Sequence, residues 1–102
     1  MSVDKVLNWH YVYILRSMKD GEFYTGYTTN PTERLKQHNA KMNLSTKSRT
    51  PFEYIYMEAC RNEQDARRRE GYLKTTQGGR FLKIRLREYG RYPKNQTPFL
   101  LV

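Results

Sequence analysis

Two short runs of aromatic and β-branched residues, separated by a tight-turn signal, constrain the fold of this chain more than any other feature. The runs are Tyr11–Leu15 and Phe23–Thr28. Such residues favour strands because their side chains pack well on a pleated surface. Asp20-Gly21 lies between the runs, and Asp-Gly is a strong signal for a hairpin turn. The sequence therefore predicts an antiparallel hairpin near the N-terminus.

Strand alternation predicts which side chains of this hairpin share a face. Tyr11, Tyr13 and Leu15 are expected on one face of the first strand. Tyr24 and Gly26 are expected together on one face of the second strand.

A helix is predicted directly after the hairpin, from Pro31 to about Ala40. Asn30 is suited to cap it, and proline is favoured at the first helical position. Glu33 stands where the acidic partner of a capping box is found.

A polar, basic segment and a third strand follow. Lys41–Pro51 is rich in Ser, Thr and basic residues, which predicts a mobile loop. Phe52–Glu58 is the predicted third strand, with Phe52, Tyr54 and Tyr56 on one face.

Two further helices are predicted in the C-terminal part. The first begins at Asn62 and ends at Gly78-Gly79, because glycine is common just after a helix end. The second covers Arg80–Tyr89, in which apolar residues recur at helical spacing, and stops at Gly90. The order strand-strand-helix-strand-helix-helix predicts an α/β domain at residues 9–90. Residues 1–8 are expected as a leader and residues 91–102 as an extended tail, whose apolar end Phe99–Val102 is a candidate contact.

The charge balance points to a nucleic-acid partner. The chain has 102 residues, with 19 Lys and Arg against 10 acids and a net charge of +9. Such an excess is the electrostatic footprint of a nucleic-acid-binding protein. A merely basic soluble protein and a protein attracted to anionic lipid are the alternatives. No amphipathic membrane anchor accompanies the charge, so we expect nucleic acid and no membrane.

The cysteine count and the apolar runs exclude several classes of protein. A single cysteine, Cys60, excludes an intramolecular disulfide and disfavours a zinc site, so it is expected as a small buried residue at a strand end. No apolar run approaches the roughly 20 residues that span a bilayer, and no signal peptide is evident. A cytoplasmic protein is expected.

Motifs of the common hydrolases and nucleotide-binding proteins are absent, and five residues in a basic chain remain as candidates: Tyr13, Tyr24, Arg34, His38 and Glu70. Arg34 and His38 are four residues apart, so they share a helix face.

In this order the residues resemble a known family. Val12-Tyr13-Ile14 and Tyr24-Thr25-Gly26, followed by Arg34 and His38, resemble the two half-motifs of the GIY-YIG nuclease superfamily. Arg68-Arg69-Glu70 with Lys74 resembles that family's helix with a metal-binding glutamate. The likeness covers about Trp9 to Leu82 and is greatest to small stand-alone bacterial members.

The resemblance implies a three-stranded antiparallel sheet flanked by helices and a phosphodiesterase that uses one divalent ion, Mg²⁺ or Mn²⁺. Tyr24 would activate water with help from Tyr13, and Glu70 would hold the metal. Arg34 would bind the scissile phosphate and lower the pKa of a tyrosine. His38 would bind phosphate or assist proton transfer. Gly26 would allow the backbone to approach the site closely.

Each candidate also has an ordinary structural interpretation when taken alone. Tyr13 and Tyr24 are of a type common in sheet cores, and Arg34 of a type common on solvated helix faces. His38 near a helix end can complement the helix dipole, and Glu70 can pair with Lys74 at i+4.

The expected activity is a metal-dependent endonuclease acting on DNA or structured nucleic acid, with DNA repair or recombination as the expected setting. A silent nucleic-acid-binding module of the same fold is the alternative. No targeting module is recognisable, so a protein partner for targeting is also expected. Phosphate contacts are expected from six basic residues: Lys41, Lys47, Arg49, Arg67, Arg68 and Lys74.

Overall fold

A computed structural model describes residues 8–91 of the chain and shows a three-stranded antiparallel sheet flanked by helices, as predicted. The strands are ordered β2-β1-β3, with β1 at His10–Ser17, β2 at Phe23–Thr28 and β3 at Phe52–Cys60. The helices are α2 (Pro31–Asn39), α3 (Glu63–Leu73) and α4 (Thr76–Arg85), and short 3₁₀ turns cover Lys47–Arg49 and Tyr89–Arg91. Most of the expected leader and tail, Phe99–Val102 included, lies outside the described residues.

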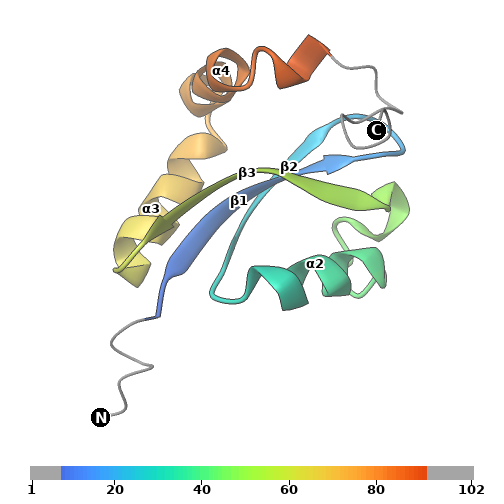
Figure 1. The fold of residues 1–102 in the computed structure, drawn as a ribbon, viewed down its shortest axis with the longest axis horizontal. Helices are drawn as coiled ribbons and strands as arrows, with labels where there is room; N and C mark the ends of the chain where they lie inside the picture. Colours follow the sequence, from blue (N-terminus) through green and yellow to red (C-terminus); the bar gives the residue numbers. More distant parts are fainter. Residues whose placement is uncertain (1–7, 92–102) are drawn as a thin grey trace.

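The helices cover both faces of the sheet. Figure 1 shows α3 and α4 on one face and α2 on the other. The central strand β1 therefore sends alternate side chains into two separate cores, and its Val12, Tyr13, Ile14 and Leu15 are all at most 2% exposed.

The predicted hairpin turn is confirmed. The Ser17 amide donates to the Glu22 carbonyl at 3.0 Å, and the Gly21 amide donates to the Ser17 carbonyl at 2.8 Å. Gly21 has a φ of 75°, a left-handed conformation that glycine adopts without the steric penalty of a Cβ atom. This turn fixes the register that pairs Tyr13 with Gly26.

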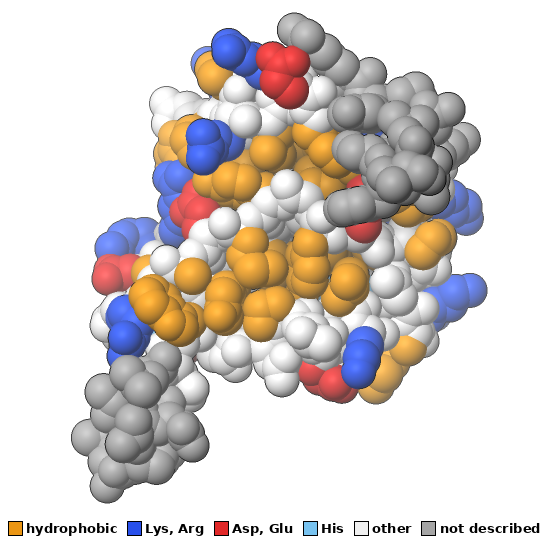
Figure 2. Space-filling model, viewed as in Figure 1, with side chains coloured by type: hydrophobic (Ala, Val, Ile, Leu, Met, Phe, Trp, Pro, Cys, Tyr) orange, Lys and Arg blue, Asp and Glu red, His pale blue; other side chains and the backbone are white. Residues whose placement is uncertain are grey.

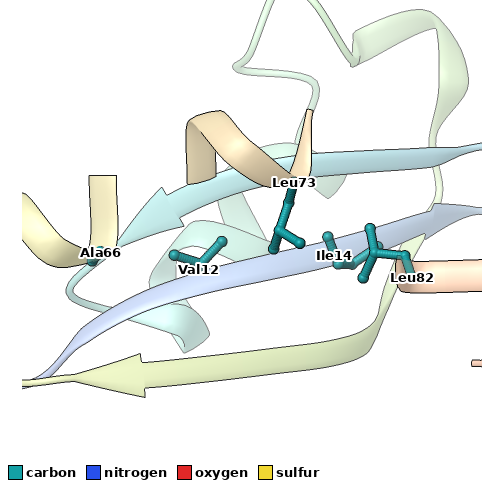
Figure 3. Close-up of a cluster of buried hydrophobic side chains, with 5 residues drawn as sticks. All are labelled: Val12, Ile14, Ala66, Leu73 and Leu82. Atoms are coloured by element: carbon teal, nitrogen blue, oxygen red, sulfur yellow. The ribbon is translucent and has the colours of Figure 1, made fainter. Parts of the chain in front are cut away.

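The core under α3 and α4 is aliphatic. Val12 and Ile14 of β1 meet Ala66 and Leu73 of α3 and Leu82 of α4 (Figure 3). Each of these side chains is at most 4% exposed, so burial of apolar area is the main force that holds this layer on the sheet.

The core on the α2 face is aromatic. Tyr13, Leu15 and Phe52 are buried there, with Tyr24, Leu35 and Tyr54 packed around them. The Tyr13 and Tyr54 rings meet edge-on with centroids 5.4 Å apart, an arrangement that aromatic pairs prefer over a face-to-face sandwich.

The prediction that Phe52, Tyr54 and Tyr56 share one face of the third strand is wrong. Phe52 and Tyr54 pack in the aromatic core, whereas Ile55 and Tyr56 pack against the aliphatic core on the opposite face. The register between β1 and β3 shifts at Ile14/Leu15, which marks a bulge. Because a bulge places two residues opposite one, the alternation reverses beyond it.

The helix boundary predicted at Gly78-Gly79 is also wrong. The helices separate at Lys74-Thr75, where the Thr75 hydroxyl accepts from the Gly78 amide at 3.1 Å and caps α4. Gly78 lies in the first turn of α4 rather than after a helix end. A Cβ atom there would lie 2.1 Å from the Tyr72 carbonyl oxygen, so the glycine allows α4 to pack closely on the end of α3.

At the start of α2, only half of the predicted capping box forms. The Asn30 side chain accepts from the Glu33 amide at 3.1 Å, as expected. The Asn30 amide donates to the Thr28 hydroxyl at 3.0 Å instead of to Glu33.

Candidate active site

A polar cleft lies along β2, an edge strand of the sheet, where the two helical layers approach each other. Its volume is about 380 Å³. The lining side chains come from β2 and the residues after it, from α2 and from α3: Tyr24, Gly26, Tyr27, Thr28, Thr29, Arg34, Arg67 and Glu70. The cleft thus brings together three of the five candidates, Tyr24, Arg34 and Glu70, from three different elements.

Tyr13 lies under this cleft rather than in it. Its side chain is fully buried, and its ring covers the α-carbon of Gly26 on the paired strand. A Cβ atom at position 26 would lie 2.3 Å from the Tyr13 hydroxyl. The glycine is therefore required for the close approach of the Tyr13 ring to β2.

The Tyr13 hydroxyl joins the two candidates of α2. Arg34 Nε donates to it at 3.3 Å, and His38 Nε2 lies 3.0 Å from it. Burial raises the pKa of Tyr13, and this outweighs the opposite effect of the Arg34 hydrogen bond and charge. Arg34 thus lowers the pKa of Tyr13 by less than burial raises it, and Tyr13 remains a neutral phenol near pH 7.

His38 is fully buried, and hydroxyl groups contact both of its ring nitrogens. Nε2 faces Tyr13, and Nδ1 lies 2.8 Å from the Thr46 hydroxyl. Burial lowers the pKa of His38, and the nearby Arg34 charge lowers it further. A neutral ring that accepts from Tyr13 and donates to Thr46 satisfies all three groups. His38 therefore orients Tyr13 and does not itself reach the cleft.

Tyr24 is the tyrosine of the pair that faces the cleft. Its half-buried ring packs edge-on against His38, with centroids 5.3 Å apart, and lies 6.4 Å from the Tyr13 ring. Tyr13 and His38 thus form a rigid base beneath Tyr24.

Arg34 connects the buried base to the open cleft. Besides the Tyr13 hydroxyl, it donates from Nη1 to the Gln37 side chain at 3.3 Å. A guanidinium has five N–H donors in a planar fork that matches phosphate geometry. These two bonds fix the orientation of the fork and leave donors for an anion in the cleft.

One face of α3 provides the other wall. Glu70 has a side chain only 19% exposed, and its carboxylate pairs with Lys74 Nζ at 3.0 Å. Arg67 lies one turn earlier, over the Tyr27 ring at 4.1 Å, and pairs with Glu63 at 2.8 Å. The i+4 pairing of Glu70 with Lys74 that the sequence suggested is therefore present, within the cleft wall.

The donor set of the cleft fits a hydrated divalent ion. Within residues 8–91 no three His, Cys, Asp or Glu side chains gather in one place, and Glu70 is the single acidic residue that lines the cleft. Mg²⁺ keeps several waters and is commonly held by one or two carboxylates together with substrate phosphates. Glu70 could hold such an ion provided that Lys74 moves away from its carboxylate.

The six basic residues expected at phosphates occupy different environments. Lys41 and Lys47 are exposed, Arg67 lines the cleft, and Lys74 pairs with the cleft residue Glu70. Arg68 pairs with Asp65 at 2.7 Å, on another side of α3. Arg49 pairs with Asp20 at 2.9 Å and lies over Phe52, so it fastens the loop to the hairpin turn.

Two residues at the site were not among the candidates predicted from the sequence. Thr46 is fully buried against His38, although its neighbours form a polar segment. Tyr27 lines the cleft, and its hydroxyl lies 2.7 Å from His10 Nδ1. Burial raises the pKa of Tyr27, and the Glu63 carboxylate adds to that effect.

No helix in the described part of the chain has the length and apolar character of a membrane span.

Comparison with known proteins gives relatives of similar size. UPF0213 protein SH2523 of Staphylococcus haemolyticus is 42% identical over 76 residues, which are 74% of this chain and 92% of that protein. UPF0213 protein OB0043 of Oceanobacillus iheyensis is 41% identical over 81 residues, which are 78% of this chain and 91% of that protein. The solution NMR structure of UPF0213 protein BH0048 of Bacillus halodurans is 38% identical, covering 72% of this chain and 81% of that one with a TM-score of 0.45.

A family-level comparison covers most of the described domain. The sequence model of the GIY-YIG catalytic domain matches residues 9–81, which run from just before β1 into α4. This range contains the whole cleft and both half-motifs around Tyr13 and Tyr24. The chain therefore belongs to the GIY-YIG catalytic domain family, a family generally of endonucleases.

Proposed function

We propose that this protein is a metal-dependent endonuclease that hydrolyses phosphodiester bonds of DNA or structured nucleic acid. The observation that carries the proposal is the convergence of Tyr24, Arg34 and Glu70 on one polar cleft of about 380 Å³. A phenol, a guanidinium and a carboxylate are the groups that water activation, phosphate binding and metal binding require. The setting that we propose for this activity is DNA repair or recombination.

Tyr24 is the group that orients the attacking water and, in its phenolate form, takes the proton of that water. It is the tyrosine of the pair whose side chain lines the cleft, whereas Tyr13 is buried and neutral. Tyr13 and His38 hold Tyr24 in place through ring packing, and the hydroxyl of Tyr13 also holds Arg34. We therefore assign positioning roles to Tyr13 and His38.

Arg34 binds the scissile phosphate. Its orientation is fixed by Tyr13 and Gln37, so little conformational freedom is lost when a phosphate binds. Arg67 at the opposite wall adds a second positive charge to the same cleft.

Glu70 is the proposed ligand of a magnesium or manganese ion. When bound, the ion supplies charge stabilisation for the leaving oxygen. Among the remaining basic residues, Lys41, Lys47 and Arg68 are exposed and are proposed to contact phosphates with salt-dependent affinity. The role of Arg49 that we propose is to hold the loop, because its guanidinium is engaged with Asp20.

A cleavage panel tests the proposal. Single-stranded, duplex, flapped and four-way-junction DNA and an RNA strand are incubated with Mg²⁺, with Mn²⁺ or with EDTA. We expect metal-dependent cleavage of at least one substrate and its loss in Glu70→Gln. Glu33→Gln is the matched control, because Glu33 is an exposed glutamate of α2 that does not line the cleft. Equal activity of Glu70→Gln and the parent would contradict the assignment of Glu70.

One observation favours the alternative of a silent nucleic-acid-binding module. Lys74 pairs with the carboxylate that a metal needs, and Glu70 is the single acidic residue that lines the cleft. Salt-sensitive binding of the panel without cleavage under any metal condition would support this alternative.

A further inference from the structure

A second hollow lies beside the candidate active site and has a different character. Its volume is about 580 Å³, and it opens between the β1–β2 hairpin, the end of α3 and the start of α4. Phe23, Thr25, Leu73 and Leu82 provide most of its apolar wall, and Lys74 and Lys83 contribute to its lining. It is distinct from the polar cleft, to which Arg34, Arg67 and Glu70 belong.

The two hollows form one path along β2 and α3. On β2, Phe23 to Thr25 line the apolar pocket, whereas Tyr24 and Gly26 to Thr28 line the cleft, so Tyr24 belongs to both. On α3, Glu70 lines the cleft, and Leu73 at the next turn lines the pocket. A polymer bound at Tyr24 and Glu70 would therefore enter the pocket with its next unit.

The wall of the pocket suits a nucleobase. Phe23 is 37% exposed at the edge of the sheet, where its ring is available for stacking. Base stacking on such rings is sequence-tolerant because every base has a π-face. The Leu73 and Leu82 side chains add an apolar floor, and a base exposes its face for such contacts only when it is not stacked in a duplex.

The charge of the rim suits the backbone of the same nucleotide. Lys83 is exposed and makes no ion pair within residues 8–91, and Lys74 lies between the pocket and the cleft. Glu22 at the hairpin end is the acidic side chain that lines this pocket. The lysines outnumber it, which favours an anionic ligand over an apolar peptide. On this view of the molecule, Figure 2 shows Lys and Arg side chains mostly at the periphery, around exposed hydrophobic side chains.

We propose that this pocket, defined by Phe23, Thr25, Leu73, Leu82 and Lys83, binds an unpaired nucleotide adjacent to the scissile phosphate. The base stacks on Phe23, and Lys83 contacts its phosphate. The protein therefore prefers nucleic acids with a single-stranded segment at the cut site over continuous duplex. This inference rests on the proposed nuclease function for its position beside the cut site, but the binding preference does not require cleavage.

Fluorescence anisotropy in EDTA separates this inference from catalysis. The probes are a labelled oligothymidylate, an oligouridylate of the same length and a labelled blunt duplex. We expect the single strands to bind more tightly than the duplex. Phe23→Ala should weaken single-strand binding by about tenfold or more and leave duplex binding within about twofold of the parent value.

Two matched controls accompany the variants. Tyr72 is an aromatic side chain of similar exposure, 39%, that lines a different hollow, and Tyr72→Ala should bind the single strands like the parent. Lys83→Gln should weaken single-strand binding more than Lys36→Gln, which removes the same charge from α2 on the other face of the sheet.

A change in self-association of Phe23→Ala, measured by sedimentation, would indicate a second copy as the occupant and overturn the inference. Equal losses for single strand and duplex would also overturn it. If the binding preference is present but no substrate is cleaved, the nuclease proposal fails and the pocket assignment stands.

Discussion

The two faces of β1 are built from different chemistry. On one face, Val12 and Ile14 pack in an aliphatic core against α3 and α4. On the other, Tyr13 belongs to a core that also buries the imidazole of His38 and the hydroxyl of Thr46. The first core depends on the burial of apolar area, and the second depends also on the pairing of every polar group. The aliphatic face therefore stabilises the fold, whereas the polar-aromatic face orients the residues of the cleft.

The largest expected loss of stability is on the aliphatic face. Leu73 is 3% exposed and touches both β1 and α4 in one cluster. Leu73→Ala should lower the free energy of unfolding by about 2–5 kcal/mol, because it removes buried area and leaves a cavity. Urea denaturation measures the change. Ile84→Ala is the control, since Ile84 is 71% exposed; a similar loss in both variants would contradict the role of this core.

Two adjacent glycines of α4 sharpen the comparison within the same layer. Gly78→Ala should destabilise the protein by about 1–3 kcal/mol, because the new methyl group meets the backbone of Tyr72 and Leu73. The methyl group added by Gly79→Ala meets nothing within 4 Å. This variant should stabilise the protein by up to about 1 kcal/mol through the higher helix propensity of alanine. The midpoint temperatures of thermal unfolding of the two variants should thus shift in opposite directions. Equal shifts would mean that α4 does not pack closely on α3.

On the polar-aromatic face, removal of the Tyr13 hydroxyl oxygen alone should lower the stability of the protein measurably. Tyr13→Phe keeps the ring over Gly26 but leaves Arg34 Nε and His38 Nε2 without their shared partner. We expect a loss of about 1–3 kcal/mol in the free energy of unfolding. Tyr72→Phe, at a ring 39% exposed, should change it little. If Tyr13→Phe were as stable as the parent, the buried hydrogen bonds would not matter to this face.

The smallest expected effect is a pH dependence of stability that arises from His38 on the polar-aromatic face. The pKa of His38 is lowered from 6.5 in the folded state. The unfolded chain therefore takes up a proton below about pH 6.5 that the folded chain does not, so stability falls as the pH falls through this range. His38→Gln removes this titration. The midpoint of urea denaturation of the variant should therefore depend less on pH between about 6.5 and 5 than that of the parent. His10→Gln is the control, and an unchanged slope in His38→Gln would contradict the burial of a neutral ring.

The sequence predicted most of the elements because their signals are local. The Asp20-Gly21 turn and the Asn30 cap depend on neighbouring residues, and both are confirmed. The bulge in β3 and the close contact at Gly78 depend on packing between distant segments, and the predictions that ignored them were wrong. The same limit applies to the site: Thr46 meets His38 through the fold of a loop whose composition predicts only mobility.

The division of labour between Tyr13 and Tyr24 is the central claim, and a paired measurement tests it most directly. Cleavage rate and free energy of unfolding are measured for Tyr24→Phe and Tyr13→Phe on the best substrate of the panel. The account predicts that Tyr24→Phe loses about 10²-fold or more in rate with its stability within about 0.5 kcal/mol of the parent. Tyr13→Phe should lose stability, and its rate should fall less than that of Tyr24→Phe. A Tyr24→Phe variant that cleaves at the parent rate would contradict the account.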